Sequence, residues 1–194
     1  MNVFSLFFHT GMQHILDLQG YDHILFLLAL VAVYKLSQVK PLLILITAFT
    51  LGHSFTLIVA TLSKGVIIPT KVIEFLIPIT IVFTAVHNIV NRERIVSGKH
   101  HLISYGLTFL FGLIHGLGFS NYLQELLMGS GQMVKALFAF NLGIETGQLL
   151  FVSFVLLFIH LLIKSEVKHR ESNLVVSGAT AGIALIMCIE RFPW

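Results

Sequence analysis

Residues 102–122 read LISYGLTFLFGLIHGLGFSNY, an apolar stretch of 21 residues that contains a single histidine, His115. About 20 such residues in a helix cross the hydrocarbon core of a bilayer. An imidazole in hydrocarbon is unfavourable unless it finds a partner. Gly112 and Gly116 flank this histidine, and glycine allows another backbone or a small ligand to come close. The stretch therefore predicts a transmembrane helix with a functional group inside the membrane.

The composition of the whole chain is that of a membrane protein. Of its 194 residues, 56% are hydrophobic and 11% are charged, and the mean hydropathy is +0.92. The sequence shows no basic patch with interleaved aromatic residues, which argues against nucleic-acid binding. The single cysteine, Cys188, excludes an internal disulfide and a multi-cysteine metal site. We expect it to be a small apolar helix residue.

We predict an all-α, polytopic transmembrane helix bundle of about six spans, in one domain that covers residues 1–194. Residues 1–19 are expected to form an amphipathic, interfacial lead-in, and residues 20–194 the six-helix bundle. The first ten residues lack the basic region of a cleavable signal peptide, so we expect them to be retained. The expected spans are Gly20–Leu36, Pro41–Leu62, Lys71–Val90, Leu102–Tyr122, Met133–Ile163 and Leu174–Ile189.

The distribution of basic residues predicts the orientation of these spans. Lysine and arginine accumulate on the cytoplasmic side of a membrane. The connections after the first, third and fifth spans carry eight of them, and the opposite side carries four. We therefore expect both termini outside and a multi-pass protein of the inner (cytoplasmic) membrane. The two sets are Lys35, Lys40, Arg92, Arg94, Lys99, Lys164, Lys168 and Arg170 against Lys64, Lys71, Lys135 and Arg191.

With this orientation, several spans carry ionisable groups between the outer surface and the midplane of the membrane. Such groups usually face the bundle interior and mark functional sites. Three polar residues of the fifth span recur at i, i+4 and i+7 and so share one face of its helix. They also suit an interhelical hydrogen-bond network with a neutral Glu145. The ionisable groups are Asp22, His23, His53, His115 and Glu145, and the three residues are Asn141, Glu145 and Gln148.

Each histidine also has a simpler interpretation. His53, within Gly52-His53-Ser54, and His115 could be packing residues that bond a carbonyl. Asp22 at the start of the first span is also favoured there by the helix dipole. His14 could lie in the wet interface, unless the chain breaks at Gly20 and folds His14 back over the site.

Taken together, imidazoles with one or two carboxylates favour a site for a divalent transition metal. Nickel, cobalt, zinc and copper prefer such donors. The chain offers no set of thiolates, and magnesium or calcium would require more oxygen ligands. We therefore expect a divalent transition metal ion, namely nickel, cobalt or zinc, at a site that is open to the outside.

Four motifs resemble those of the HupE/UreJ family in the same order. They are DHILFL at 22–27, FTLGHSFTL at 49–57, FGLIHGLGF at 111–119 and FNLGIETGQ at 140–148. The family consists of bacterial membrane proteins that are associated with hydrogenase and urease clusters and regarded as nickel permeases. The resemblance implies metal-handling roles for Asp22, His23, His53, His115 and Glu145, and His14 falls where a family histidine is expected. Ser54, Asn141, Gln148, Gly112 and Gly116 are the expected supporting residues.

Three functions remain open at this point. The first is a permease for nickel or cobalt, in which His87 is the only candidate on the path to the cytoplasm. The second is an intramembrane zinc-dependent hydrolase that acts on a lipid or peptide, with Glu145 or Asp22 as base and Ser54 or Asn141 near the oxyanion. The third is a non-catalytic subunit whose polar groups only join helices. The expected partners are a metal ion and the lipid bilayer, and a homo-oligomer is left open.

Overall fold

The computed structural model describes residues 2–63, 69–91, 98–127, 131–162 and 166–193. Within these ranges the chain forms α-helices, one short 3-10 helix and no strand, so the all-α prediction is confirmed. The elements are α1 (Val3–Leu16), α2 (Asp22–Val31), η1 (Leu36–Gln38), α3 (Val39–Leu62), α4 (Thr70–Asn91), α5 (Gly98–Leu127), α6 (Met133–Leu162) and α7 (Glu166–Glu190).

Four of the described segments are long and apolar enough to cross a membrane. They are 36–62, 70–90, 133–162 and 169–190. The expected first span is shorter than predicted, because α2 is an apolar helix of 10 residues that ends at Val31. The amides of Ala32 and Tyr34 close its last turn. Lys35 is then extended, and the chain turns through η1 into α3.

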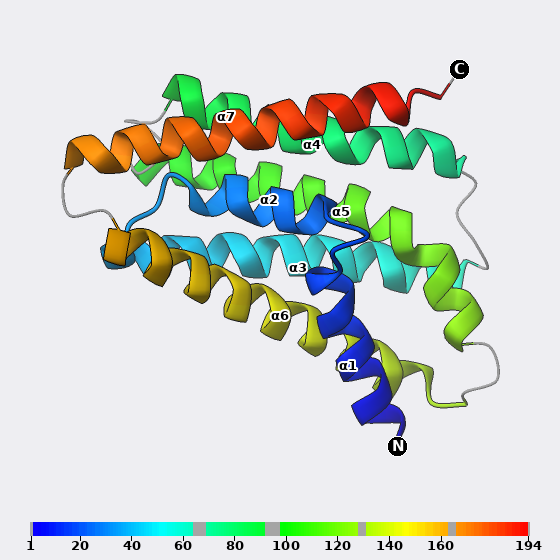
Figure 1. Ribbon diagram of the computed structural model, residues 1–194. Coiled ribbons are helices and arrows are strands. Elements are labelled where there is room, and N and C mark those ends of the chain that lie inside the picture. Colours follow the sequence, from blue (N-terminus) through cyan, green and yellow to red (C-terminus); the bar gives the residue numbers. More distant parts are fainter. Residues whose placement is uncertain (1, 64–68, 92–97, 128–130, 163–165, 194) are drawn as a thin grey trace.

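The helices α2 to α7 run roughly along one direction, and α1 lies across α6 (Figure 1). Both termini lie at the same end of the bundle, where α3, α5 and α7 end (Figure 1). The prediction of which end faces the cytoplasm depends on the basic residues of the connections. Lys64, Arg92, Arg94 and Lys164 lie outside the described residues.

Helices α3 and α5 cross in backbone contact, and we call this contact the α3/α5 crossing. A Cβ on Gly52 would overlap the carbonyl oxygen of Phe109, and a Cβ on Gly112 would overlap that of Phe49. The contact is reciprocal, since each glycine meets the carbonyl three residues before the other glycine. Small residues allow such close approach between helices in membranes. Gly112 and Gly52 therefore position α3 and α5 against each other.

Helices α1 and α6 meet in the same way, at the α1/α6 crossing. A Cβ on Gly11 would overlap the carbonyl oxygen of Phe140, and a Cβ on Gly143 would overlap that of Phe8. The structure packs α1 against α6 along a buried face, and the interfacial place expected for residues 1–19 stays a prediction. The glycines explain this packing, because they let the two backbones touch. The chain then breaks over residues 17–21 before α2 begins.

Candidate metal centre

Three histidines from three helices converge near the crossings. One ring nitrogen of His14, one of His23 and one of His53 all lie within 4.8 Å of one another. The ring centroids of His14 and His23 are 4.5 Å apart, and those of His14 and His53 are 5.8 Å apart. The break after α1 makes this possible, because it folds His14 back towards the start of α2. The sequence predicts His23 and His53 in the outer half of the membrane and leaves His14 either in the interface or folded back over the site, and only the packing brings the three together.

His115 joins the group from the side of His23. Their ring centroids are 5.1 Å apart, and the His115 side chain is buried. We call His14, His23, His53 and His115 the histidine cluster. At the α3/α5 crossing, a Cβ on Gly116 would lie 2.6 Å from the His53 carbonyl oxygen. Gly112 and Gly116 therefore bring the helix of His115 against the backbone of His53, and their supporting role at a metal site stays a prediction.

Asp22 orients His23. Its Oδ1 lies 3.1 Å from His23 Nδ1 and also accepts the backbone N–H of His23. Its Oδ2 lies 3.2 Å from the guanidinium of Arg191, at the end of α7. A histidine that donates one ring N–H to a carboxylate presents its other nitrogen as a ligand. Asp22 thus acts on the cluster through His23, and His23 Nε2 is the ring nitrogen left without a partner among the described residues.

Thr80 of α4 orients His115 in a similar way. The Thr80 hydroxyl donates to the carbonyl of Ile77, and its oxygen lies 3.2 Å from His115 Nε2. Because the hydroxyl proton is already used, the oxygen is an acceptor, and Nε2 of His115 is assigned as the N–H donor. His115 Nδ1 therefore keeps its lone pair. His23 and His115 are each held in the tautomer that leaves one nitrogen available.

Five nitrogens of the cluster are buried without a hydrogen-bond partner in the described part of the chain. They are His14 Nε2, His23 Nε2, both ring nitrogens of His53 and His115 Nδ1. A buried polar atom without a partner costs about 1–3 kcal/mol. Native structures rarely accumulate such atoms without a functional reason. Neutral imidazole nitrogens at this spacing suit a transition metal ion, whose bonds to nitrogen are about 2.0–2.1 Å long. The donor set therefore fits the predicted class of metal.

A groove of about 780 Å³ reaches the cluster at His14. We call it the α1 groove. The ring of Phe119 covers His14, with the two ring centroids 3.9 Å apart, and Phe119 stacks on Phe140 at 5.1 Å. Asp17 lines the groove and gives it an acidic group. The lining residues are Thr10, Met12, Gln13, His14, Leu16, Asp17, Leu18, Gln19, Phe119 and Tyr122.

The predicted polar face of α6 lies against α3, outside the group of converging histidines. Glu145 accepts a hydrogen bond of 2.9 Å from Thr47, and Gln148 accepts one of 2.8 Å from Thr50. Asn141 donates to the carbonyl of Leu137 on its own helix. These contacts match the interhelical hydrogen-bond alternative for Glu145 and Gln148.

Three further residues complete this description, one that was predicted and two that were not. Ser54 is half-buried next to His53 on α3. Arg191 and Thr80 were not singled out as site residues from the sequence, although both contact the cluster or its carboxylate. A hydroxyl in an apolar helix usually bonds a carbonyl of its own helix, so Thr80 had no distinctive signal. Arg191 had a signal in the sequence, because it is a cation at the end of the last apolar stretch.

The comparisons with known proteins agree with the resemblance in the motifs. A family model described as "HupE / UreJ protein" matches residues 1–191 of the chain. No curated protein and no solved structure matches it.

Proposed function

The chain belongs to the HupE/UreJ family, and from this membership and the histidine cluster we propose that it is a membrane permease for a divalent transition metal ion, nickel or cobalt. The family is in general nickel- and cobalt-transporter-like. The observation that carries the proposal is the set of five buried imidazole nitrogens without hydrogen-bond partners among the described residues. A subunit whose polar groups only join helices would pair these nitrogens with carbonyls or hydroxyls.

The ligands of the ion are the ring nitrogens of the cluster. His14, His23 and His53 provide the converging donors, and His115 extends them towards α4. Asp22 positions His23 and lowers the net positive charge at the site. Glu145 belongs to the neighbouring α3/α6 contact through Thr47, at the edge of the site.

The ion reaches the cluster through the α1 groove. In the proposed topology, the six spans are α3 to α7 and the shorter segment that contains α2, both termini face the outside, and the protein resides in the inner membrane. The groove, which lies beside residues 17–19, then opens to the outside. Asp17 attracts a cation at its rim, and Phe119 covers the last step to His14. Protonation of the imidazoles releases the ion, because a metal ligand must be deprotonated.

The zinc hydrolase receives less support from the geometry. A metal-dependent hydrolase needs a general base beside the metal-bound water. Asp22, one of the two candidate bases, is already engaged by His23 and Arg191. Glu145, the other, bonds Thr47 outside the converging histidines. Both carboxylates therefore have structural partners, which favours transport over hydrolysis.

The test combines metal binding and uptake. Purified protein is titrated with Co²⁺ and Ni²⁺, and uptake is measured in proteoliposomes, for the wild type and for His53→Ala. We expect binding and uptake in the wild type and loss of both in the variant. His160→Ala is the matched control, because His160 is exposed near the end of α6. A wild type that binds metal without uptake and hydrolyses a lipid or peptide would support the hydrolase, and one that binds no metal would support the structural subunit.

A further inference from the structure

An ion pair joins the end of α7 to the first residue of α2. Nη1 of Arg191 lies 3.2 Å from Oδ2 of Asp22. Arg191 follows α7 directly, and its backbone N–H donates to the carbonyl of Met187 at 3.0 Å, which anchors it to that helix. Helices α2 and α7 pack against each other, and the end of α7 lies at the same end of the bundle as the start of α2 (Figure 1). We call this contact the Asp22–Arg191 pair.

The Asp22–Arg191 pair holds the carboxylate on both sides. Oδ1 of Asp22 accepts the backbone N–H of His23 and contacts its ring, and Oδ2 accepts from Arg191. The side chain of Asp22 is 13% exposed and that of Arg191 is 30% exposed. Hydrogen bonds between charged groups are about twice as strong as those between neutral groups. The carboxylate therefore has donors on both oxygens, and its charge is compensated by a cation.

Asp22 lies beside the histidine cluster as well as within the pair. It contacts His23 directly and is close enough to His14 and His115 to interact with both electrostatically. The charge of Arg191 also acts on His115. A carboxylate in this place can turn towards an ion in the cluster when nothing holds its second oxygen. With Arg191 in place, the donors left without partners among the described residues are ring nitrogens of the cluster.

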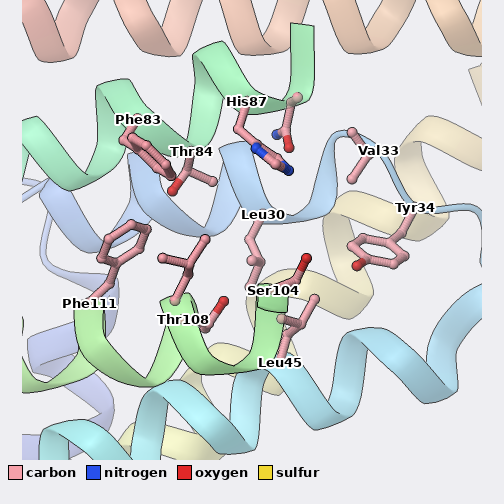
Figure 2. A pocket seen from close by; sticks show the side chains of 12 residues that line it. Leu30, Val33, Tyr34, Leu45, Phe83, Thr84, His87, Ser104, Thr108 and Phe111 are labelled. Carbon is pink, nitrogen blue, oxygen red and sulfur yellow. The ribbon is translucent and has the colours of Figure 1, made fainter. Parts of the chain in front are cut away.

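A pocket between α2, α4 and α5 offers a comparison within the same bundle (Figure 2). The imidazole of His87 faces mainly apolar side chains there, and no carboxylate is among the residues that line this pocket. Such a lining does not suit a divalent metal ion. The histidine cluster differs in having four imidazoles and a neighbouring carboxylate that a cation holds. The metal preference of the cluster therefore depends on whether Asp22 is available to the ion.

We propose that Arg191 is a positioning residue that determines the metal preference of the histidine cluster. By holding Asp22, it keeps the carboxylate away from the ion, so that imidazole nitrogens bind the ion. Imidazole donors favour nickel and cobalt over manganese, whereas carboxylate oxygens suit manganese and magnesium. Arg191 thus selects against Mn²⁺, although this ion carries the same charge as Co²⁺. The inference rests on the proposed permease function, because it concerns the ion that the same site accepts.

The experiment measures the ratio of two metal affinities. Full-length protein in detergent is titrated with Co²⁺ and, separately, with Mn²⁺, for the wild type and for Arg191→Gln. We expect the ratio of Co²⁺ affinity to Mn²⁺ affinity to fall about tenfold in the variant, the lower end of the effects known for groups next to metal-bound histidines. The absorption spectrum of bound Co²⁺ should also change, because an oxygen ligand enters. Thermal unfolding of the metal-free protein, measured in parallel, shows that each variant is folded.

Three further variants separate this role from a structural one. Arg191→Lys should retain the wild-type ratio, because the contact is made through Nη1 and an ammonium group can replace it. Asp22→Asn combined with Arg191→Gln should show no gain in Mn²⁺ affinity over Asp22→Asn alone, because the released carboxylate is missing. Arg170→Gln is the matched control, since Arg170 is an exposed arginine near the start of α7, and it should leave the ratio unchanged.

The outcomes separate the inference from the permease function. If Arg191→Gln changed both affinities by the same factor, Arg191 would act only on the fold or as a general positive charge, and the inference would be wrong. A gain in Mn²⁺ affinity that persisted in the double variant would also refute it. Uptake of Co²⁺ in proteoliposomes tests the permease separately. A wild type that binds Co²⁺ without uptake would refute the permease, while a lowered ratio in Arg191→Gln would still support the role of Arg191. A wild type that binds no Co²⁺ would refute both.

Discussion

The α3/α5 crossing and the α1/α6 crossing use the same contact in two different settings. Both are built from a pair of Phe-x-x-Gly segments, in which each glycine touches the carbonyl of the partner phenylalanine. The four segments are Phe49–Gly52 with Phe109–Gly112 and Phe8–Gly11 with Phe140–Gly143. At the first crossing the contact includes the backbone of His53 itself, because a Cβ on Gly112 would lie 3.1 Å from its amide nitrogen.

At the α1/α6 crossing, in contrast, the proposed ligand His14 lies beyond the contact. His14 follows Gly11 by three residues on a helix of 14 residues, and the chain breaks directly after this helix. The α1 groove also runs along this helix. We therefore expect the α3/α5 crossing to be the fixed wall of the proposed metal site, and α1 to be the wall that is more easily displaced. Glycine substitutions can test this difference.

The largest effect is expected from Gly112→Ala. Its Cβ would overlap the Phe49 carbonyl oxygen, so the two backbones must separate. Overpacking of this kind costs about 1–3 kcal/mol, and we expect the upper end of this range. Thermal unfolding in detergent should show the loss, and Co²⁺ binding should disappear because His53 and His115 move apart. Gly106→Ala, on the same helix with open space around its Cβ, should leave both properties intact.

Gly11→Ala should cost less stability, about 1–2 kcal/mol, because α1 can move away from α6. The bundle remains folded, but the cluster loses His14. We expect Co²⁺ affinity to fall on the order of tenfold, as for other perturbed ligand shells. His14→Ala should produce the same loss of affinity with little change in unfolding temperature. If Gly11→Ala unfolded the protein as completely as Gly112→Ala, the two crossings would be equivalent and the distinction between them wrong.

A smaller difference is expected between the second glycines of the two crossings. A Cβ on Gly116 would lie 2.6 Å from the His53 carbonyl oxygen, whereas a Cβ on Gly147 would lie 3.2 Å from that of Met12. Gly116→Ala should therefore destabilise the protein by about 1 kcal/mol more than Gly147→Ala does. Gly182→Ala on α7 meets nothing within 4 Å and serves as the reference. Equal unfolding temperatures for the two variants would contradict the closer packing of the α3/α5 crossing.

The smallest effect on stability is expected from Thr80→Val. Valine keeps the shape of the side chain but removes the hydroxyl oxygen of α4 that accepts from His115 of α5 and orients its ring. Groups that hydrogen-bond to metal-bound histidines contribute about 10–100-fold to metal affinity, and we expect the lower end because the hydroxyl is neutral. Co²⁺ titration with parallel unfolding would measure both quantities. Thr80→Ser should restore the affinity, and unchanged affinity in Thr80→Val would remove Thr80 from the site.

The polar face of α6 was only partly predictable from the sequence. The polar face of α6 was predictable from the spacing of Asn141, Glu145 and Gln148, because a helix places these positions on one side. What that face contacts was not predictable. Glu145 could equally have met the histidines, but the way α6 packs on α3 gives it Thr47 as its partner. Spacing determines directions within one helix and carries no information on the rotation of its neighbour.

The sequence alone determined the helical class, the family and the apolar segments. It also showed histidines in apolar segments, where hydrocarbon disfavours them. Composition and local periodicity determine these properties, since each depends on residues close together in the chain. The tertiary structure decided that His14 returns to meet His23 and His53, and that Asp22 lies between His23 and Arg191. The contact between Asp22 and Arg191 joins residues from opposite ends of the chain. The meeting of the three histidines depends on glycine faces that let two backbones touch, and the order of residues within one helix does not reveal this.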